Sequence, residues 1–289
     1  MFLKPLPDKN MIMNITISGT EVSNVILDDL KEKIKKMDNK PKLVIVQVGD
    51  NPASETYVGM KLKRAKSIGM DAMLKKLPEN AKEKELLDIV NELNHDKHVT
   101  GFIVQLPLPK HMNETTVINS IDPKKDVDGF TSTNIGNLVL GIPEENILLP
   151  ATPAGIIKLL EYYKIPIKGK HAVVVGRSNI VGKPVASLLL NRSATVTICH
   201  SRTNNLAAHT KQADILVVAV GKPGIITADM VKDGAYVFDV GTSKVNGKLC
   251  GDVDFENIIK KAHCSPVPGG VGPMTVAMLL NNVVKTKMQ

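Results

Sequence analysis

Residues 173–190 read VVVGRSNIVGKPVASLLL, and this stretch decides the fold class. Three valines make a β-rich run, Gly176 opens a turn, and a helix is expected from about Gly182. This order leaves backbone N–H groups and a helix N-terminus facing one crevice, which suits a pyrophosphate. The stretch therefore predicts a dinucleotide-binding turn. It keeps only two of the glycines of G-x-G-x-x-G, so a tight turn without a ligand is the alternative.

Apolar, β-rich runs recur along the chain with helical stretches between them. Such alternation is typical of parallel sheets covered by helices. The sequence therefore predicts an α/β fold. The runs are Leu43–Val48, Phe102–Val104, Ala172–Val175, Thr195–Cys199, Ile215–Val218 and Tyr236–Val240.

The length of 289 residues fits two domains, each with its own core. A stretch that contains Pro and Gly, Gly141–Pro153, separates the two series of runs. We predict an N-terminal α/β substrate domain over 1–145 and a C-terminal Rossmann-like parallel sheet over 146–272, with a cleft between them. A helix over about 273–289 is expected to pack back on the first domain. Residues 1–14, which include three methionines, are set apart from the fold.

The composition is that of a soluble globular protein, with 43% hydrophobic and 23% charged residues. No apolar run approaches the ~20 residues that span a bilayer, so no membrane partner is expected. The net charge is +8, but only four residues are arginine, aromatic residues make up 3%, and there is no tryptophan. Side chains that read or stack on bases are therefore scarce, which argues against nucleic acid. The positive field favours small anions instead.

Cysteine and histidine usage points to neither a disulfide framework nor a metal site. Cys199, Cys250 and Cys264 form no C-x-x-C pair, and their number is odd. A reducing, cytoplasmic location fits best. Histidines such as His95 and His98 lack further ligands at zinc spacing, so no metal is predicted.

The end of the second strand of the nucleotide series indicates which cofactor binds. A fold that prefers NAD usually places Asp or Glu there to hold the ribose 2′-hydroxyl. This strand ends instead in His200-Ser201-Arg202-Thr203. Because no carboxylate repels a phosphate, and Arg177 and Ser201 are available as donors, we predict NADP.

Polar side chains that suit chemistry lie in the first half of the chain. Tyr57 and Lys61 are four residues apart on an expected helix, so they share a face with Cβ atoms roughly 5–6 Å apart. Gln105 follows a strand, at the edge where parallel strands place ligands. Asp126 and Asp128 lie in a polar turn, where a carboxylate accepts paired N–H donors of a heterocycle or simply forms the turn.

Together these segments resemble the bifunctional methylenetetrahydrofolate dehydrogenase/cyclohydrolase family. They follow the family's order over nearly the whole chain beyond residue 14, which is far more specific than one glycine pattern. Two departures are Thr242, where the family often has an aliphatic residue, and Arg192, where an asparagine-rich turn is common. The matching segments are VGDNPASETYVGMKLKRAKSIGM (48–70), GFIVQLPLP (101–109), DPKKDVDGF (122–130), PATPAGI (150–156), VVVGRSNIVGKPVA (173–186), TVTICHSRT (195–203), ADILVVAVGKPG (213–224) and VPGGVGPMTVAMLL (267–280).

The resemblance implies a reaction in two steps. 5,10-Methylenetetrahydrofolate gives a hydride to NADP⁺ and becomes the 5,10-methenyl cation, which water opens to 10-formyltetrahydrofolate. By the same resemblance the substrates are tetrahydrofolate derivatives, polyglutamylated forms among them, and the protein is a homodimer through its nucleotide domain.

The resemblance also implies roles for particular residues. Lys61 transfers the proton as water adds, because an amine against apolar walls loses preference for its charged form, and Gln105 orients it. Tyr57 stacks on the folate, Asp128 accepts hydrogen bonds from the pterin, and Ser54 lines the pocket. The same pocket includes Pro268, Gly269, Gly270 and Gly272. Cofactor contacts are carried over by position to Gly176, Arg177, Ser178, Ser201 and Thr242.

Three other interpretations compete with this one. A dehydrogenase of the same family that has lost hydrolysis and uses NAD would not need Lys61 and Gln105 together, and would have an acidic residue after the second strand. A non-catalytic nucleotide-binding regulator would not need the ordered set that also includes Tyr57 and Asp128. Nucleic-acid binding would rest on charge alone.

Overall fold

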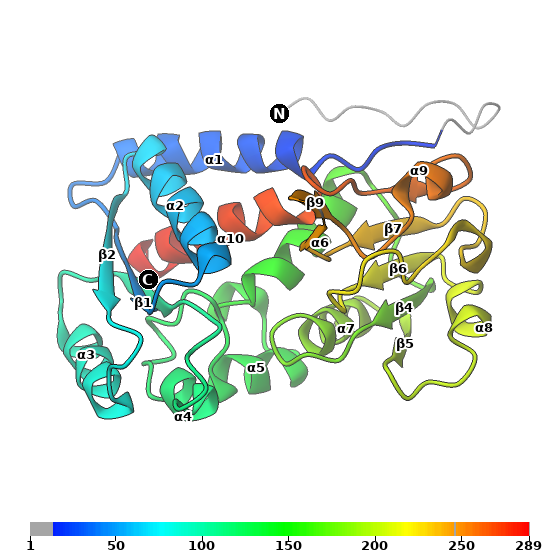
Figure 1. Cartoon of the computed structure of the whole chain (residues 1–289). Helices are drawn as coiled ribbons and strands as arrows, with labels where there is room; N and C mark the ends of the chain where they lie inside the picture. Colours follow the sequence, from blue (N-terminus) through cyan, green and yellow to red (C-terminus); the bar gives the residue numbers. More distant parts are fainter. Residues whose placement is uncertain (1–13, 246, 289) are drawn as a thin grey trace. The chain divides into compact units, whose positions relative to one another are not determined.

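The computed structural model describes residues 14–245 and 247–288, and the chain divides into two compact units. The five-stranded unit contains the chain up to Ser23 and Thr152–Thr275, and the three-stranded unit contains Asn24–Ala151 and the chain from Val276 onward. Each unit is built on a parallel sheet with helices, as Figure 1 shows, so the predicted α/β class is confirmed. Residues 1–13 of the segment set apart above lie outside the described residues.

The three-stranded unit has strand order β2-β1-β3, with both pairs parallel. Its strands are β1 (Lys42–Val48), β2 (Asp71–Leu77) and β3 (Gly101–Val104). Its helices are α1 (Gly19–Lys35), α2 (Pro52–Ser67), α3 (Glu83–His95), α4 (Glu114–Asn119), α5 (Ser132–Val139), the 3-10 turn η1 (Glu144–Asn146) and α10 (Val271–Met288), of which α1 and α10 begin in the other unit.

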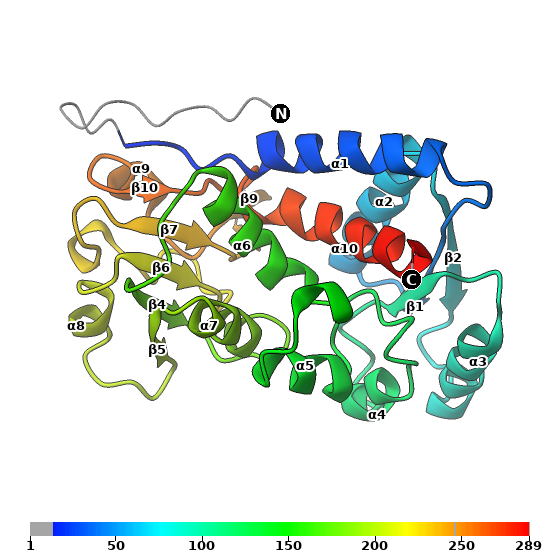
Figure 2. The ribbon, with the colours of Figure 1, turned by 180° about the vertical axis from the view of Figure 1, so that it is seen from behind.

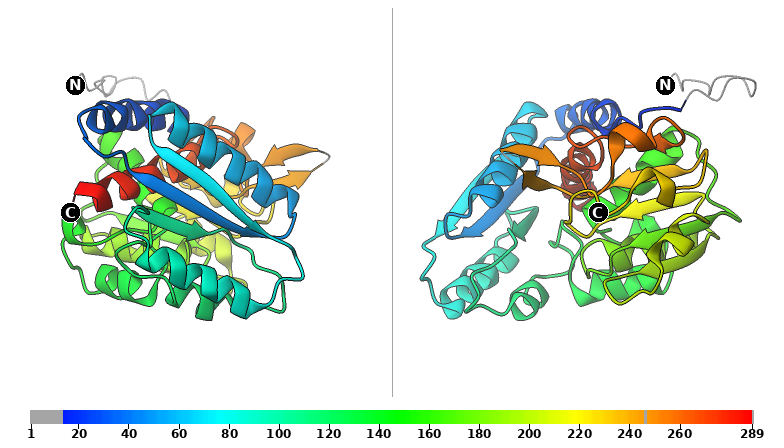
Figure 3. Two further views of the ribbon diagram at one scale, coloured as in Figure 1. Left: turned by 90° about the vertical axis from the view of Figure 1, so that its left-hand side faces the viewer. Right: turned by 45° about the vertical axis from the view of Figure 1, so that its right-hand side comes forward.

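Apolar residues on one face of this sheet form a core with α3 and α4. β1 contributes Val44 and Val46, and β3 contributes Phe102, which is fully buried. Leu86 and Val90 recur at helical spacing on α3 and complete the cluster. Helix α2 packs against β1 and β2, as the left view of Figure 3 shows. Only residues 49–51 separate the carboxyl end of β1 from the first turn of α2.

Helix α10 is tied to the three-stranded unit by its polar side chains. The amide nitrogen of Asn282 donates to the carbonyl oxygens of Val127 at 2.9 Å and Leu149 at 2.8 Å. Lys285 donates to the carbonyl oxygens of Glu144 and Ile147. These bonds satisfy backbone oxygens within and around η1 and attach the segment 127–149 to α10.

The five-stranded unit has strand order β10-β7-β6-β4-β5, with every pair parallel. Figure 2 shows α7 against β4 and β5. The strands are β4 (His171–Val175), β5 (Thr195–Cys199), β6 (Ile215–Val218), β7 (Tyr236–Asp239) and β10 (His263–Cys264), with the hairpin β8 (Ser243–Val245) and β9 (Lys248–Cys250). The helices are α6 (Ala151–Tyr162), α7 (Gly182–Asn191), α8 (Leu206–Thr210), the 3-10 turn η2 (Ala228–Met230) and α9 (Phe255–Ile258).

All six predicted strands are present, and the described residues form four further strands that were not predicted. These are β2, β8, β9 and β10. Within the described ranges, no helix combines the length and apolar character needed to cross a membrane.

Candidate active site

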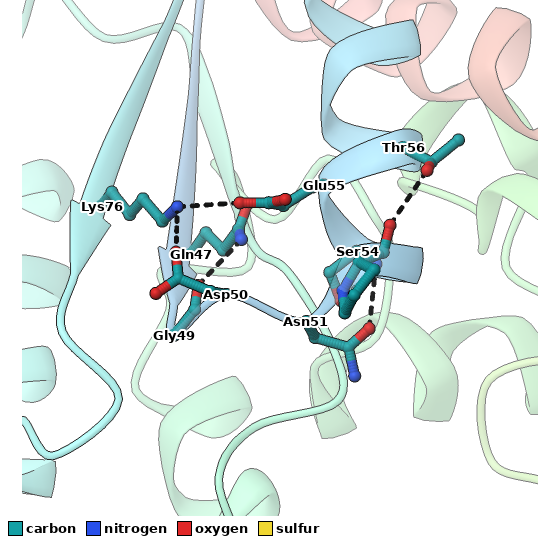
Figure 4. A network of polar contacts seen from close by, with 9 residues as sticks. Gln47, Gly49, Asp50, Asn51, Ser54, Glu55, Thr56 and Lys76 are labelled. Atoms are coloured by element: carbon teal, nitrogen blue, oxygen red, sulfur yellow. Dashed lines mark hydrogen bonds and ion pairs between the residues drawn. The ribbon is translucent and has the colours of Figure 1, made fainter.

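The first turn of α2 is held in place by charged and capping contacts, drawn in Figure 4. The ammonium of Lys76, near the end of β2, pairs with the carboxylates of Asp50 and Glu55, the latter at 2.9 Å. These hydrogen bonds raise the pKa of Lys76. The side chain of Asn51 accepts a hydrogen bond from the backbone N–H of Ser54 at 3.2 Å and so caps the helix. This network sets the direction of α2 at the carboxyl edge of the sheet.

One turn into α2 the helix carries Tyr57 and then Lys61, as the sequence analysis predicted. Lys61 is 6% exposed, and its Nζ lies 3.1 Å from Oε1 of Gln105, which directly follows β3. The Gln105 amide nitrogen donates to the carbonyl of Leu106 at 2.7 Å. Because that bond fixes which way the amide faces, its oxygen is presented to the lysine. The expected contact between Lys61 and Gln105 is therefore present.

The two aspartates of the polar turn have different surroundings. Asp126 is buried and accepts hydrogen bonds from the N–H groups of Gly129 at 2.9 Å and Thr131 at 2.8 Å, and from the amide of Asn134 at 3.0 Å. It therefore forms the turn. None of the hydrogen bonds found between described residues involves the carboxylate of Asp128. The sequence left open which aspartate does what, and the structure assigns the turn to Asp126.

The electrostatic setting of Asp128 also suits a ligand. Burial raises the pKa of Asp128, the positive charge of Lys61 opposes the rise, and Asp126 adds to it. Its side chain nevertheless keeps part of its surface open to solvent. A carboxylate that is closely packed but lacks internal donors gains most from N–H groups that a ligand brings.

The remaining predicted pocket residues divide between the two units. Ser54 is buried in the first turn of α2, in the three-stranded unit. Pro268, Gly269, Gly270 and Gly272 lie in the five-stranded unit, where the carbonyl of Gly269 accepts from the N–H of Thr20 at 2.9 Å. A shared pocket for Ser54 and these residues stays a prediction.

The glycine turn after β4 has the close approaches that its sequence requires. Gly176 has φ +130°, and a Cβ there would lie 2.3 Å from the carbonyl oxygen of Ala219. A Cβ on Gly182 would lie 2.4 Å from the carbonyl oxygen of Gly176. Only glycine fits at both positions, so the backbone folds tightly into the N-terminus of α7. That arrangement suits the pyrophosphate of a dinucleotide.

The side chains around this turn face solvent. The hydroxyl of Ser178 accepts from the N–H groups of Val181 and Gly182, each at 3.2 Å, and leaves its own proton for a phosphate. Arg177 and Ser201 are exposed, and the pairing of Val175 with Cys199 in register brings their segments to one edge of the sheet. Thr242 is exposed between β7 and β8.

Arg192, one of the two departures from the family pattern, lies away from this turn. It follows the carboxyl end of α7, where its guanidinium pairs with the carboxylate of Glu161 at 3.5 Å.

Asp239, at the end of β7, is a buried acid that the sequence analysis missed. Its Oδ1 accepts from the N–H groups of Gly241 and Asp252, both at 2.9 Å, and its Oδ2 from the N–H of Val253 at 3.1 Å. Burial raises the pKa of Asp239 to about 6, these hydrogen bonds oppose the shift, and the neighbouring Asp252 adds to it.

The raised pKa of Asp239 predicts a stability that depends on pH. Between about pH 4 and 6 the folded protein keeps a proton on this carboxyl that the unfolded chain has lost, so stability falls as pH rises through this window. The shift corresponds to about 3 kcal/mol. We expect the free energy of unfolding of wild type, relative to Asp239→Asn, to fall by about this amount between pH 4 and 7.

Urea denaturation at several pH values measures this difference. Glu256→Gln, which removes an exposed carboxylate of α9, is the matched control and should leave the slope unchanged. A difference between wild type and Asp239→Asn that is constant with pH would show that Asp239 titrates normally.

Among the described residues no group of three or more His, Cys, Asp or Glu side chains is arranged to hold a metal ion. The site instead offers side chains that can bind an organic ligand. These are a buried lysine with its amide partner, an aromatic ring, and a carboxylate that can accept hydrogen bonds from a ligand. A separate glycine turn suits a dinucleotide. A glycine turn that opens a helix at the carboxyl ends of parallel strands defines the class of α/β proteins that bind dinucleotides.

Comparison with known proteins identifies the family. Residues 17–128 match the tetrahydrofolate dehydrogenase/cyclohydrolase catalytic domain, and residues 150–289 match the NAD(P)-binding domain of the same family. The bifunctional protein FolD of a Nitratiruptor species is 49% identical over 278 residues, which cover 94% of this chain and 98% of that protein. The chain belongs to the tetrahydrofolate dehydrogenase/cyclohydrolase family.

Solved structures agree with this assignment. The bifunctional FolD enzyme from Campylobacter jejuni, a methylenetetrahydrofolate dehydrogenase/cyclohydrolase, has a TM-score of 0.92 at 47% identity, covering 94% of this chain and 98% of that one. The methylenetetrahydrofolate dehydrogenase-cyclohydrolase of Trypanosoma brucei, complexed with NADP and an inhibitor, has a TM-score of 0.91 at 37% identity, covering 96% and 99%.

Proposed function

We infer that this chain oxidises 5,10-methylenetetrahydrofolate to 5,10-methenyltetrahydrofolate with NADP⁺ and hydrolyses that product to 10-formyltetrahydrofolate. Family membership supports both activities. The observation that best supports the hydrolytic step is the hydrogen bond between buried Lys61 and Gln105. This bond fixes the position of a side chain that can transfer a proton. We propose that the three-stranded unit is the catalytic domain and the five-stranded unit the cofactor domain, with the division between Ala151 and Thr152 lying close to the boundary expected from the sequence.

Lys61 is proposed to move the proton of the hydrolytic step. Water adds to the methenyl carbon as Lys61 takes one of its protons. Lys61 then passes that proton to the ring nitrogen as the bond from this nitrogen to the carbon breaks, and the remaining hydroxyl proton leaves to solvent as the formyl C=O forms. Gln105 holds the amine through its oxygen, which keeps Nζ from rotating away from the reacting carbon. Gln105 therefore acts on the position of Lys61 and not on the substrate itself.

Substrate binding is proposed to rest on the groups around Lys61. Tyr57 lies one turn earlier on α2 and offers a ring for stacking on the folate. Asp128 accepts hydrogen bonds from N–H groups of the pterin, since no hydrogen bond between described residues occupies its carboxylate. Ser54, in the first turn of the same helix, is proposed to line the folate pocket of this unit.

NADP⁺, when bound, supplies the hydride acceptor. Gly176 and Ser178 are proposed to receive its pyrophosphate at the N-terminus of α7, with Thr242 at the neighbouring strand end. Arg177 and Ser201 are proposed to bind the 2′-phosphate, which no acidic side chain at the end of β5 would repel.

Initial rates of cofactor reduction test the NADP assignment. With 5,10-methylenetetrahydrofolate we expect kcat/KM for NADP⁺ to exceed that for NAD⁺ by roughly tenfold or more, because hydrogen bonds to a charged group are worth about 1.5–3 kcal/mol. Equal values for the two cofactors would contradict the proposed contacts of Arg177 and Ser201.

We also propose a homodimer through the five-stranded unit. β5 is an edge strand of this sheet, and it leaves Ile198 42% exposed, while Leu190 on α7 is 61% exposed. An exposed edge with apolar side chains suits pairing with a second copy.

The charge and the cysteines bear on two further proposals. A net charge of +8 favours polyglutamylated folates as substrates. The free thiols of Cys199, Cys250 and Cys264 fit a cytoplasmic location.

A further inference from the structure

The turn after β6 is held from behind by a buried carboxylate. Asp252 follows β9 and is 0% exposed. Its Oδ2 accepts hydrogen bonds from two consecutive backbone N–H groups, those of Val220 at 2.7 Å and Gly221 at 2.9 Å. These N–H groups therefore point into the protein, so they are not the donors that this turn offers to a ligand.

The first of these hydrogen bonds fixes the peptide that contacts the nucleotide turn. In a trans peptide the N–H and the C=O point in opposite directions, so the N–H of Val220 and the carbonyl of Ala219 form one rigid unit. With the N–H on Asp252, the carbonyl faces Gly176, where a Cβ would lie 2.3 Å from the oxygen. Asp252 thus orients the group against which the Gly176 turn is packed.

The surroundings of Asp252 show that this arrangement is maintained at a cost. Its Oδ1 is buried and has no hydrogen-bond partner among the described residues, and a Cβ on Gly241 would lie 2.3 Å from it. A second buried acid, Asp239, accepts from the N–H of Asp252 and fixes its backbone. A buried oxygen without a partner destabilises the fold, and such costs are typically kept where function needs the geometry.

We propose that Asp252 is a positioning residue for NADP, which it serves by holding the 219–220 peptide against the Gly176 turn. This inference rests on the proposed function. Without the carboxylate the peptide is free to rotate, and the Ala219 carbonyl no longer supports the turn that receives the pyrophosphate. Nothing in the sequence marks Asp252, because Gly251-Asp252-Val253-Asp254 reads as an ordinary polar loop.

Binding of NADP⁺, measured by calorimetry, and hydrolysis of supplied 5,10-methenyltetrahydrofolate, which needs no cofactor, together test the proposal. We expect Asp252→Ala to raise the Kd for NADP⁺ by roughly tenfold or more. Asp252→Asn keeps an oxygen for the two N–H groups and should raise it only about threefold. Hydrolysis should stay within about twofold of wild type in both, and Glu256→Gln should change neither quantity.

The possible outcomes separate three explanations. Unchanged NADP⁺ affinity in both variants would overturn the positioning role. A parallel loss of NADP⁺ binding and hydrolysis in folded Asp252→Asn would overturn it too, because Asp252 would then support the fold in general. A wild-type protein that does not bind NADP⁺ would overturn the proposed function itself.

Discussion

Lys61→Met should lower the rate of methenyltetrahydrofolate hydrolysis by about 100-fold or more. Methionine has a similar length, but its thioether can neither accept nor donate a proton at neutral pH. NADP⁺ binding should persist, since Lys61 belongs to the three-stranded unit and the glycine turn to the other. Removal of the Lys61 nitrogen also leaves the oxygen of Gln105 without this donor. The measurement is the rate at which supplied 5,10-methenyltetrahydrofolate disappears, together with the Kd for NADP⁺.

Lys63→Met is the matched control for this experiment. Lys63 lies on the same helix but is exposed, so its loss changes the net charge equally without touching the Gln105 contact. Hydrolysis at the wild-type rate in Lys61→Met would remove Lys61 from the mechanism. Equal losses in both variants would show that charge, and not position, matters.

Asp128→Asn should raise the KM for the folate substrate and lower kcat/KM by about 100-fold, since a closely packed carboxylate that binds N–H donors is worth several kcal/mol. The amide has the same shape, so the fold is expected to persist. Burial raises the pKa of Asp128, so as the pH is lowered its carboxylate takes up a proton at a higher pH than an ordinary aspartate does. Wild-type folate affinity should therefore begin to fall at that higher pH. The variant should lack this acidic limb.

Steady-state kinetics over a range of pH values measure both effects. Asp88→Asn, which removes an exposed carboxylate from α3, serves as the control. Normal constants in Asp128→Asn would show that the pterin is bound elsewhere. A loss that is confined to NADP⁺ affinity would place Asp128 at the cofactor instead.

The sequence predicts those parts of the fold whose signal is local and strong. The run of valines, Gly176 and the helix after Gly182 specify β4, its turn and α7, because burial on both faces demands apolar strands and close packing demands glycine. The shared face of Tyr57 and Lys61 follows from helical spacing in the same way. Long-range contacts of such groups, as between Lys61 and Gln105, needed the family resemblance.

The missed elements have no such signal. β2 reads DAMLKKL and is an edge strand in which most residues are exposed, so it lacks the apolar run that marks a buried strand. β10 has only two residues, and the β8–β9 hairpin is mostly exposed. Their pairing is set by neighbouring strands and not by their own composition.

The polar residues show the same limit. Asp126 and Asp128 are two positions apart in one turn, and only the donors that reach Asp126 distinguish them. Asp239 and Asp252 become important because the fold brings N–H groups from distant segments onto their oxygens. No spacing rule in the sequence encodes such contacts.

The most direct test of the account is product analysis after wild-type protein has acted on 5,10-methylenetetrahydrofolate and NADP⁺. We expect NADPH to form and the absorbance of the methenyl compound to appear only after acid converts the formyl product back. Methenyl absorbance that accumulates before acidification would contradict the hydrolytic role of Lys61. No NADPH at all would contradict the proposed function.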